Sequence, residues 1–219
     1  MYLHTRTHSR CNACIQAAQE YDARRKRRWC WLPCLSLKMP YAKLVFLKKK
    51  TLETRGSSCL AKYENQYVIL QVSKGVAEKQ RPSPLHIALE LGMAAADLEE
   101  CTMCQKGCAV AVLELGKTTK VRDSPAGQDV RLWRRQTFVG PIRPPDSYVT
   151  EILQVHPLAK AIPMLGVESH PHPRVLLRSC LPTTLDPELL ETCETRELAR
   201  AQRLGRVRTF TRVKWDPWQ

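Results

Sequence analysis

The sequence lacks long apolar runs. Its longest aliphatic run is Ala109–Leu113, far short of the roughly 18 apolar residues that a membrane-spanning helix needs. The first residues read Met-Tyr-Leu-His-Thr-Arg and contain no apolar segment of the kind found in secretory signals. We therefore expect neither a transmembrane segment nor secretion, and we place the chain inside the cell.

Core-forming residues are also scarce. Leu, Ile, Val and Phe together make up 51 of the 219 residues, and only 14 residues are aromatic. This fraction lies close to the level, roughly a fifth, below which a highly charged chain stays disordered. With a net charge of +14, the composition predicts a small, partly disordered α+β protein.

Acidic residues are rare in the first third of the chain. Residues 1–81 hold 17 Lys and Arg against 5 Asp and Glu, a net charge of +12. Two runs of like charge dominate this segment, and because such runs repel, we expect both to be solvated and to bind phosphates or an import receptor. The candidate residues are Arg24, Arg25, Lys26, Arg27 and Arg28 in the first run and Lys48, Lys49 and Lys50 in the second.

Aromatic residues flank the first basic run, with Tyr21 before it and Trp29 and Trp31 after it. Cationic side chains combined with rings that stack on bases are typical of surfaces that bind single-stranded nucleic acid. The same order is also compatible with two tryptophans buried in a small core.

Cysteines are plentiful, with ten in the chain. Without secretion they are not expected to form a disulfide framework. Cys11 and Cys14 form a C-x2-C pair and Cys30 and Cys34 a C-x3-C pair, with 15 residues between the pairs. Two such pairs resemble the ligand spacing of a structural zinc site. Zinc is therefore a possible cofactor, and four free thiols in a basic arm are the alternative.

A second cysteine group, Cys101, Cys104 and Cys108, has C-x2-C-x3-C spacing. If a helix continued through them, the three thiols would share one face and could bind a soft metal or support redox chemistry. Packing of small side chains in the core is the alternative, which we prefer. No catalytic motif is present, so we expect no enzyme activity.

Hydrophobic periodicity predicts short strands at Lys43–Leu47 and Tyr67–Val72 and two principal helices, at about 84–103 and 187–204. Asp186 and Pro187 are placed as the N-cap and first residue of the second helix. Nine of the 15 prolines fall between Pro141 and Pro187, which predicts an irregular segment. Four segments are expected: a basic Cys/His-containing arm (1–56), a small α+β core (57–140), a proline-rich irregular segment (141–186), and a C-terminal helix and tail (187–219). The arm is either disordered or a small zinc module.

Together these features predict a small, basic, non-enzymatic nuclear protein that binds nucleic acid or a nuclear partner through its N-terminal basic runs. Two alternatives stay open. The first is an interaction protein that docks a partner through its proline-rich segment and last helix. The second is a recently arisen, largely unstructured chain without biochemical activity, because local signals rarely agree beyond one element. The cytoplasm is the alternative location.

Overall fold

The computed structural model describes residues 29–74, 86, 89–90, 92–94, 103–121, 136–137, 147–164 and 172–203. Within them, six strands form one mixed sheet in the order β2-β5-β4-β3-β1-β6. The elements are β1 (Trp29–Leu37), α2 (Tyr41–Phe46), β2 (Leu52–Arg55), the 3-10 turn η1 (Ala61–Tyr63), β3 (Gln66–Val72), β4 (Cys108–Lys120), β5 (Tyr148–Pro163), β6 (His172–Leu177), the 3-10 turn η3 (Arg178–Cys180) and α6 (Pro187–Arg203).

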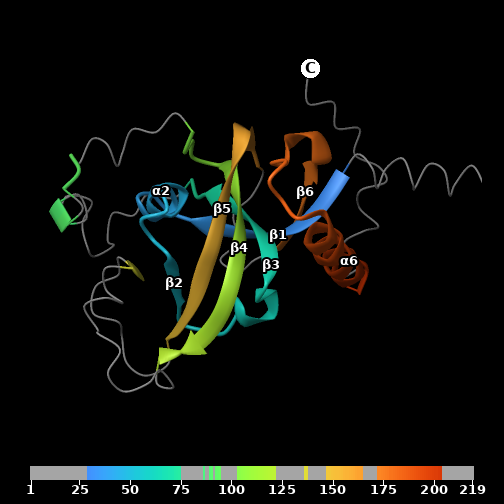
Figure 1. Ribbon diagram of the computed structural model, residues 1–219, viewed down its shortest axis with the longest axis horizontal. Coiled ribbons are helices and arrows are strands. Elements are labelled where there is room, and N and C mark those ends of the chain that lie inside the picture. Colours follow the sequence, from blue (N-terminus) through green and yellow to red (C-terminus); the bar gives the residue numbers. More distant parts are fainter. Residues whose placement is uncertain are drawn as a thin grey trace, which may run out of the picture.

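The sheet is mostly antiparallel, and only β1 and β3 run parallel to each other. Figure 1 shows β1 crossing behind β4 and β5 at a steep angle, as expected of a strongly twisted sheet. The sheet curls so that β2, at one end of the strand order, approaches β1, the last strand but one at the other end. Arg55 Nη2 on β2 lies 3.5 Å from the carbonyl oxygen of Ser36 on β1.

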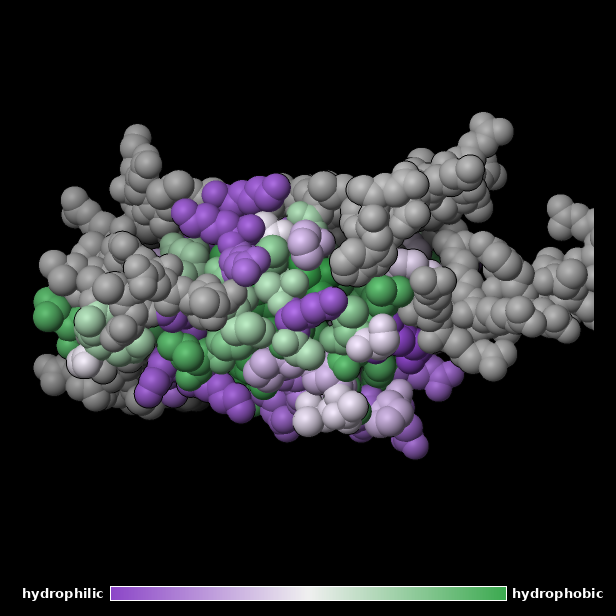
Figure 2. Space-filling view, turned by 90° about the horizontal axis from the view of Figure 1, so that it is seen from above, coloured by the Kyte–Doolittle hydropathy of each residue, from purple (hydrophilic) through white to green (hydrophobic). Residues whose placement is uncertain are grey.

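Two apolar clusters cover the two faces of the sheet. The first includes Val68, Leu70 and Val110 and packs beneath α2 and η1. The second includes Tyr67 and Ile69 and packs beneath α6. This division follows the alternation of β3, whose successive side chains point to opposite faces. Seen from above, apolar residues dominate the middle of the molecule, and hydrophilic side chains lie mainly around them (Figure 2).

The fold class predicted from the sequence is wrong. Instead of a small, partly disordered fold with short strands and two principal helices, the described residues form a six-stranded sheet with strands of 13 and 16 residues and one long helix. All four expected segments contribute to this arrangement, since β1 and β2 come from 1–56, β3 and β4 from 57–140, β5 and β6 from 141–186, and α6 from 187–219.

Two local expectations fail for identifiable reasons. The strand expected at Lys43–Leu47 is the helix α2, which buries Ala42, Leu44 and Val45 against the sheet. The helix expected over 84–103 is not continuous, because residues 92–94 are not helical and Gly92 has a φ of 64°, the left-handed conformation that ends helices. Residues 95–102 lie outside the described residues. Residues 103–107 are turn and irregular structure that leads into β4.

The irregular segment expected from the prolines contains the longest strand, β5. β2 pairs only with Tyr148–Glu151 of β5, so beyond that point β5 has an open edge within the described sheet. Pro157 lies on this edge part, beside a register shift in the pairing with β4. Edges and bulges are the places where a strand tolerates proline, and the proline count therefore does not exclude a strand.

The C-terminal helix is where the sequence predicts it. The Asp186 carboxylate accepts hydrogen bonds from the backbone N–H groups of Glu188 and Leu189, at 2.8 and 3.4 Å. These bonds satisfy donors that the first turn of a helix leaves without partners. The strand predicted at Tyr67–Val72 is also present, within β3.

Candidate functional site

A buried ionic cluster lies where α2 leads into β2. Lys48 has a φ of 58°, a tight left-handed turn after α2, and the backbone N–H groups of Lys49 and Lys50 both donate to the carbonyl oxygen of Leu44. This turn exposes Lys48 and Lys49 and directs Lys50 inward, so that Lys50 is only 1 % exposed. The expectation that all three lysines are solvated is therefore wrong for Lys50.

The Lys50 ammonium group has a complete set of acceptors. Its Nζ donates to the carbonyl oxygens of Leu52 and Thr137, at 2.5 and 2.6 Å, and lies 3.3 Å from Glu53 Oε2. An ammonium group has three donors, and these three partners use all of them. Burial lowers the pKa of Lys50, and Glu53 acts in the opposite direction. All three donors of Lys50 are therefore in use, and they link Lys50 to β2 and to the segment that contains Thr137.

Glu53 forms a second ion pair, with the more accessible cation Arg55. Its Oε2 faces Lys50, and its Oε1 lies 3.0 Å from Arg55 Nε. Glu53 and Arg55 are two residues apart on β2 and so lie on the same side of the strand. The Arg55 side chain is 25 % exposed, and its guanidinium group carries more donors than Glu53 occupies. Of the three charged groups, Arg55 is the one suited to bind a ligand anion.

Tyr41 forms the wall of the cluster on the α2 side. Its ring centre lies 5.8 Å from Lys50 Nζ. Burial raises the pKa of the Tyr41 hydroxyl, and the Glu53 carboxylate raises it further. The ring is half-buried, so it presents both an aromatic surface and a neutral hydroxyl beside the charges.

The cluster has an excess of positive charge, with two cations and one anion. The surrounding segment is more basic still, since residues 36–56 contain six Lys and Arg and only one acidic residue, Glu53. That one carboxylate is buried and paired, and Lys43 and Lys50 are buried as well. The exposed cations of the segment are Lys38, Lys48 and Lys49, and Glu151 on β5, opposite Leu52, is the exposed acidic neighbour. The turn after α2 therefore presents the positive charge that suits a polyanion.

Of the residues predicted to bind nucleic acid or an import receptor, the described structure contains Lys48, Lys49 and Lys50, whereas Arg24–Arg28 lie outside the described residues. Trp29 and Trp31, which follow that run, lie half-buried on β1. The sequence reading missed Glu53, Arg55 and Tyr41. A signal existed in the spacing Lys-x-x-Glu-x-Arg, because Glu53 is the one acidic residue in a densely basic segment.

The structure describes two of the four predicted zinc ligands, Cys30 and Cys34, and it does not bring their thiols together. Both lie on the extended strand β1, where four residues span about 13 Å, too far for two thiolates bound to one zinc ion about 2.3 Å from each. Cys30 packs near Cys193, whereas Cys34 Sγ donates to Gln71 Oε1 at 3.4 Å. Cys11 and Cys14 lie outside the described residues.

The described part of the chain contains no group of three or more His, Cys, Asp or Glu side chains that could hold a metal ion. Cys104 and Cys108 are buried but do not lie on a helix, and Cys101 is outside the described residues. Burial raises the pKa of Cys108, which is unfavourable for a reactive thiolate. No helix among the described residues is long and apolar enough to cross a membrane.

Comparison with known proteins gives little further guidance. No protein-family model matches the sequence, and no curated protein matches it. Among solved structures, the fold is similar to the crystal structure of ASCH from Zymomonas mobilis, with a TM-score of 0.36 and 12% sequence identity. The match covers 77% of this chain and 93% of that one.

Proposed function

We propose that this protein binds the phosphate backbone of nucleic acid through the basic surface around α2 and the start of β2. The observation that carries the proposal is the arrangement of charge. Lys48 and Lys49 are exposed in the turn, Arg55 is partly exposed on β2, and Glu53, the only carboxylate of the segment, is buried between Lys50 and Arg55.

Each part of this surface has a distinct role in the proposal. Lys48 and Lys49 are flexible point charges that attract phosphates without fixing a geometry, whereas the planar guanidinium group of Arg55 can donate two hydrogen bonds to one phosphate. Lys50 and Glu53 hold Arg55 in place. The half-buried ring of Tyr41 offers a surface on which a base can stack, as aromatic side chains do in proteins that bind single strands.

The Arg24–Arg28 run precedes β1 directly in the sequence and adds charge of the same sign. Its role in binding phosphates or an import receptor stays a prediction, as does the nuclear location.

Removing the two exposed lysines tests the proposal. We expect the double variant Lys48→Ala/Lys49→Ala to raise the Kd for a fluorescein-labelled single-stranded RNA by about tenfold, since two exposed charge contacts contribute on the order of 1.4 kcal/mol together. Fluorescence anisotropy at low salt measures the change. Both side chains are exposed, so stability should change by less than about 0.5 kcal/mol.

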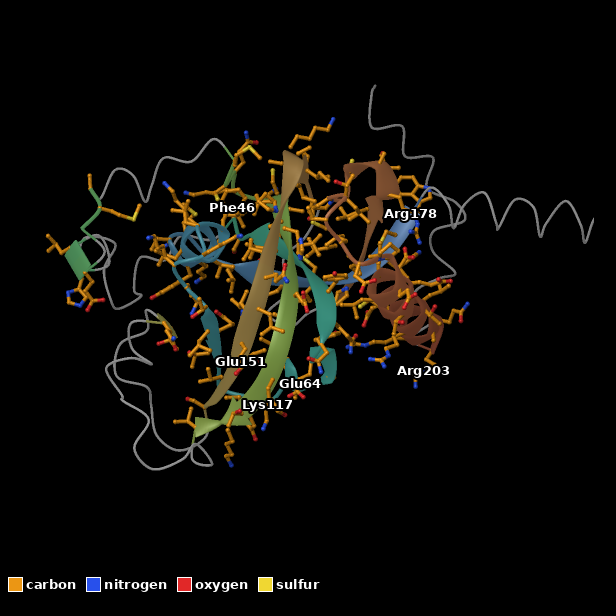
Figure 3. All side chains as sticks on the ribbon, viewed as in Figure 1. Phe46, Glu64, Lys117, Glu151, Arg178 and Arg203 are labelled. Atoms are coloured by element: carbon orange, nitrogen blue, oxygen red, sulfur yellow. The ribbon has the colours of Figure 1, made fainter. Side chains whose placement is uncertain are left out.

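A matched control removes the same charge elsewhere. Lys117 on β4 and Arg203 at the end of α6 are exposed, and Figure 3 shows both far from Phe46, the last residue of α2. The double variant Lys117→Ala/Arg203→Ala should bind RNA almost as well as the wild type. Equal loss in both double variants would show that only net charge matters and would contradict a defined surface at α2.

A further inference from the structure

A short segment fastens the C-terminal helix to the sheet. We call residues Leu181–Asp186, between η3 and α6, the strap. Two side chains of the sheet hold it. His156 Nδ1 on β5 lies 2.8 Å from Thr184 Oγ1, and the Tyr67 hydroxyl on β3 accepts a hydrogen bond from the backbone N–H of Asp186 at 2.9 Å. Both anchors lie at the N-terminal end of α6.

The two anchoring side chains contact each other. The rings of Tyr67 and His156 meet edge to face, with centroids 5.8 Å apart. His156 is 7 % exposed, and its second nitrogen, Nε2, is buried and has no hydrogen-bond partner among the described residues. The ring is therefore accommodated as a neutral group, because a protonated imidazole would place an N–H donor and a charge where nothing receives them.

Beneath the strap and α6 lies an apolar surface. Leu185 of the strap and Leu190 of α6 pack onto the second cluster. Cys193 is fully buried there, and its sulfur accepts a hydrogen bond from the backbone N–H of Tyr67 at 3.3 Å. Leu185 and Leu190 are buried there, and Leu181 and Leu189 pack partly buried against the same cluster. The two polar anchors add to this apolar contact and lie where the strap meets α6.

We propose that the strap and the first half of α6 form an acid-sensitive cover over this face of the sheet, and that protonation of His156 loosens it. The proton comes from solvent and is added at whichever ring nitrogen is unprotonated, so that both nitrogens become donors. A charged ring then lies in an apolar setting with a buried donor at Nε2. When the strap lifts, water reaches the ring, solvates its charge and accepts a hydrogen bond from Nε2. This proposal does not depend on nucleic-acid binding.

The surrounding groups determine the direction of the pH effect. Burial lowers the pKa of His156, Glu114 on β4 acts to raise it, and Lys48 after α2 acts to lower it further. Tyr67 on β3 remains neutral, since burial raises the pKa of its hydroxyl, and Thr184 on the strap does not titrate. With the pKa of His156 lower when the strap is docked than when it is released, acid favours release. Docking is complete above the ordinary histidine pKa and weakens as the pH falls.

Thiol labelling tests the proposal in the full chain. Cys193 reacts only when α6 lifts, whereas Cys104, which is buried beneath the opposite face, reports global unfolding. A pyridyl disulfide reacts with thiols even in acid, and its rate with each cysteine, mapped by mass spectrometry, is divided by its rate with glutathione at the same pH. Between about pH 8 and about pH 5, we expect labelling of Cys193 to accelerate several-fold while that of Cys104 stays slow.

Two variants make the test specific. His156→Gln keeps a group that can hydrogen-bond to Thr184 but cannot take up a proton, so it should remove the acceleration in acid. Thr184→Val removes one anchor from an exposed position and should accelerate labelling of Cys193 already at about pH 8. Three results would overturn the proposal: labelling of Cys193 that is independent of pH, Cys104 and Cys193 accelerating together, or an unchanged acid response in His156→Gln.

Discussion

Replacing Lys50 with methionine is expected to lower the free energy of unfolding by about 3–5 kcal/mol, the loss typical of breaking a buried ion pair from one side. The substitution keeps the length and apolar body of the side chain but removes the charge. It leaves Glu53, 6 % exposed, with Arg55 as its remaining ionic partner, and it removes the donor that the carbonyl oxygens of Leu52 and Thr137 share. Urea unfolding of the full chain measures the loss.

Two further variants distinguish burial from charge. Lys49→Met removes the same charge from the adjacent exposed position and should change stability by less than about 0.5 kcal/mol. Adding Glu53→Gln to Lys50→Met should recover part of the loss, because no uncompensated carboxylate then remains buried. If Lys49→Met and Lys50→Met were equally stable, Lys50 would not have the buried position described above.

The second large effect is expected at Arg200 on α6. Arg200 donates to the hydroxyl of Tyr63 and lies 3.6 Å from Glu197 Oε1, whereas Glu197 Oε2 is buried and has no hydrogen-bond partner in the described part of the chain. Arg200→Met leaves the Glu197 carboxylate, 3 % exposed, with only the weaker attraction of nearby Lys62. We expect a loss of about 3 kcal/mol near neutral pH, measured by urea unfolding against Arg203→Met, an exposed position one turn away.

The same pair predicts a pH dependence. Burial raises the pKa of Glu197 and Arg200 lowers it, so removing Arg200 raises it further. A carboxyl group whose pKa is higher in the folded state contributes fully to stability below its unfolded pKa and loses that contribution as the pH rises through its folded pKa. The deficit of Arg200→Met relative to the wild type should therefore shrink toward about pH 4 and grow toward about pH 8.

Adding Glu197→Gln to Arg200→Met should remove most of this pH dependence, because the group that titrates is gone. A deficit that is constant over the same pH range would mean that Arg200 contributes only through Tyr63, whose hydroxyl it contacts and whose pKa burial raises to about 12.

Helix capping explains why α6 could be predicted from the sequence. Its start depends on local chemistry, namely the Asp186 carboxylate and Pro187 at the first position. β3 was predictable because Tyr67, Val68, Ile69 and Val72 are the aromatic and β-branched side chains that favour strands. These signals operate within a few residues of the chain and need no knowledge of distant partners.

α2 and β5 could not be predicted for the opposite reason. The α2 segment has an apolar run that suits a strand, but contacts with the sheet make it a helix. β5 carries prolines that argue against a strand, and it tolerates Pro157 because that residue lies on a part of β5 that β2 does not cover. Tertiary context decided both elements, and a single sequence does not contain it.

The candidate site was predicted in part. The sequence located the basic segment containing Lys48–Lys50 but not its inner structure. A run of three lysines predicts three solvated charges, and only the turn at Lys48 shows that the third points inward. Glu53 and Arg55 could be recognised as part of the site only once Lys50 was known to be buried, because Glu53 pairs with Lys50 and Arg55 pairs with Glu53.

Salt dependence of RNA binding tests the central claim most directly. The Kd of the wild-type chain for a single-stranded RNA is measured by anisotropy from about 50 to about 200 mM salt, beside an oligomer of the same sequence with an uncharged backbone. If phosphates are the ligand, log Kd rises steeply with log salt, by about 0.7 for each phosphate neutralised, and the uncharged oligomer binds far more weakly. Binding that is independent of salt, or equal for both oligomers, would contradict a phosphate-binding surface at α2.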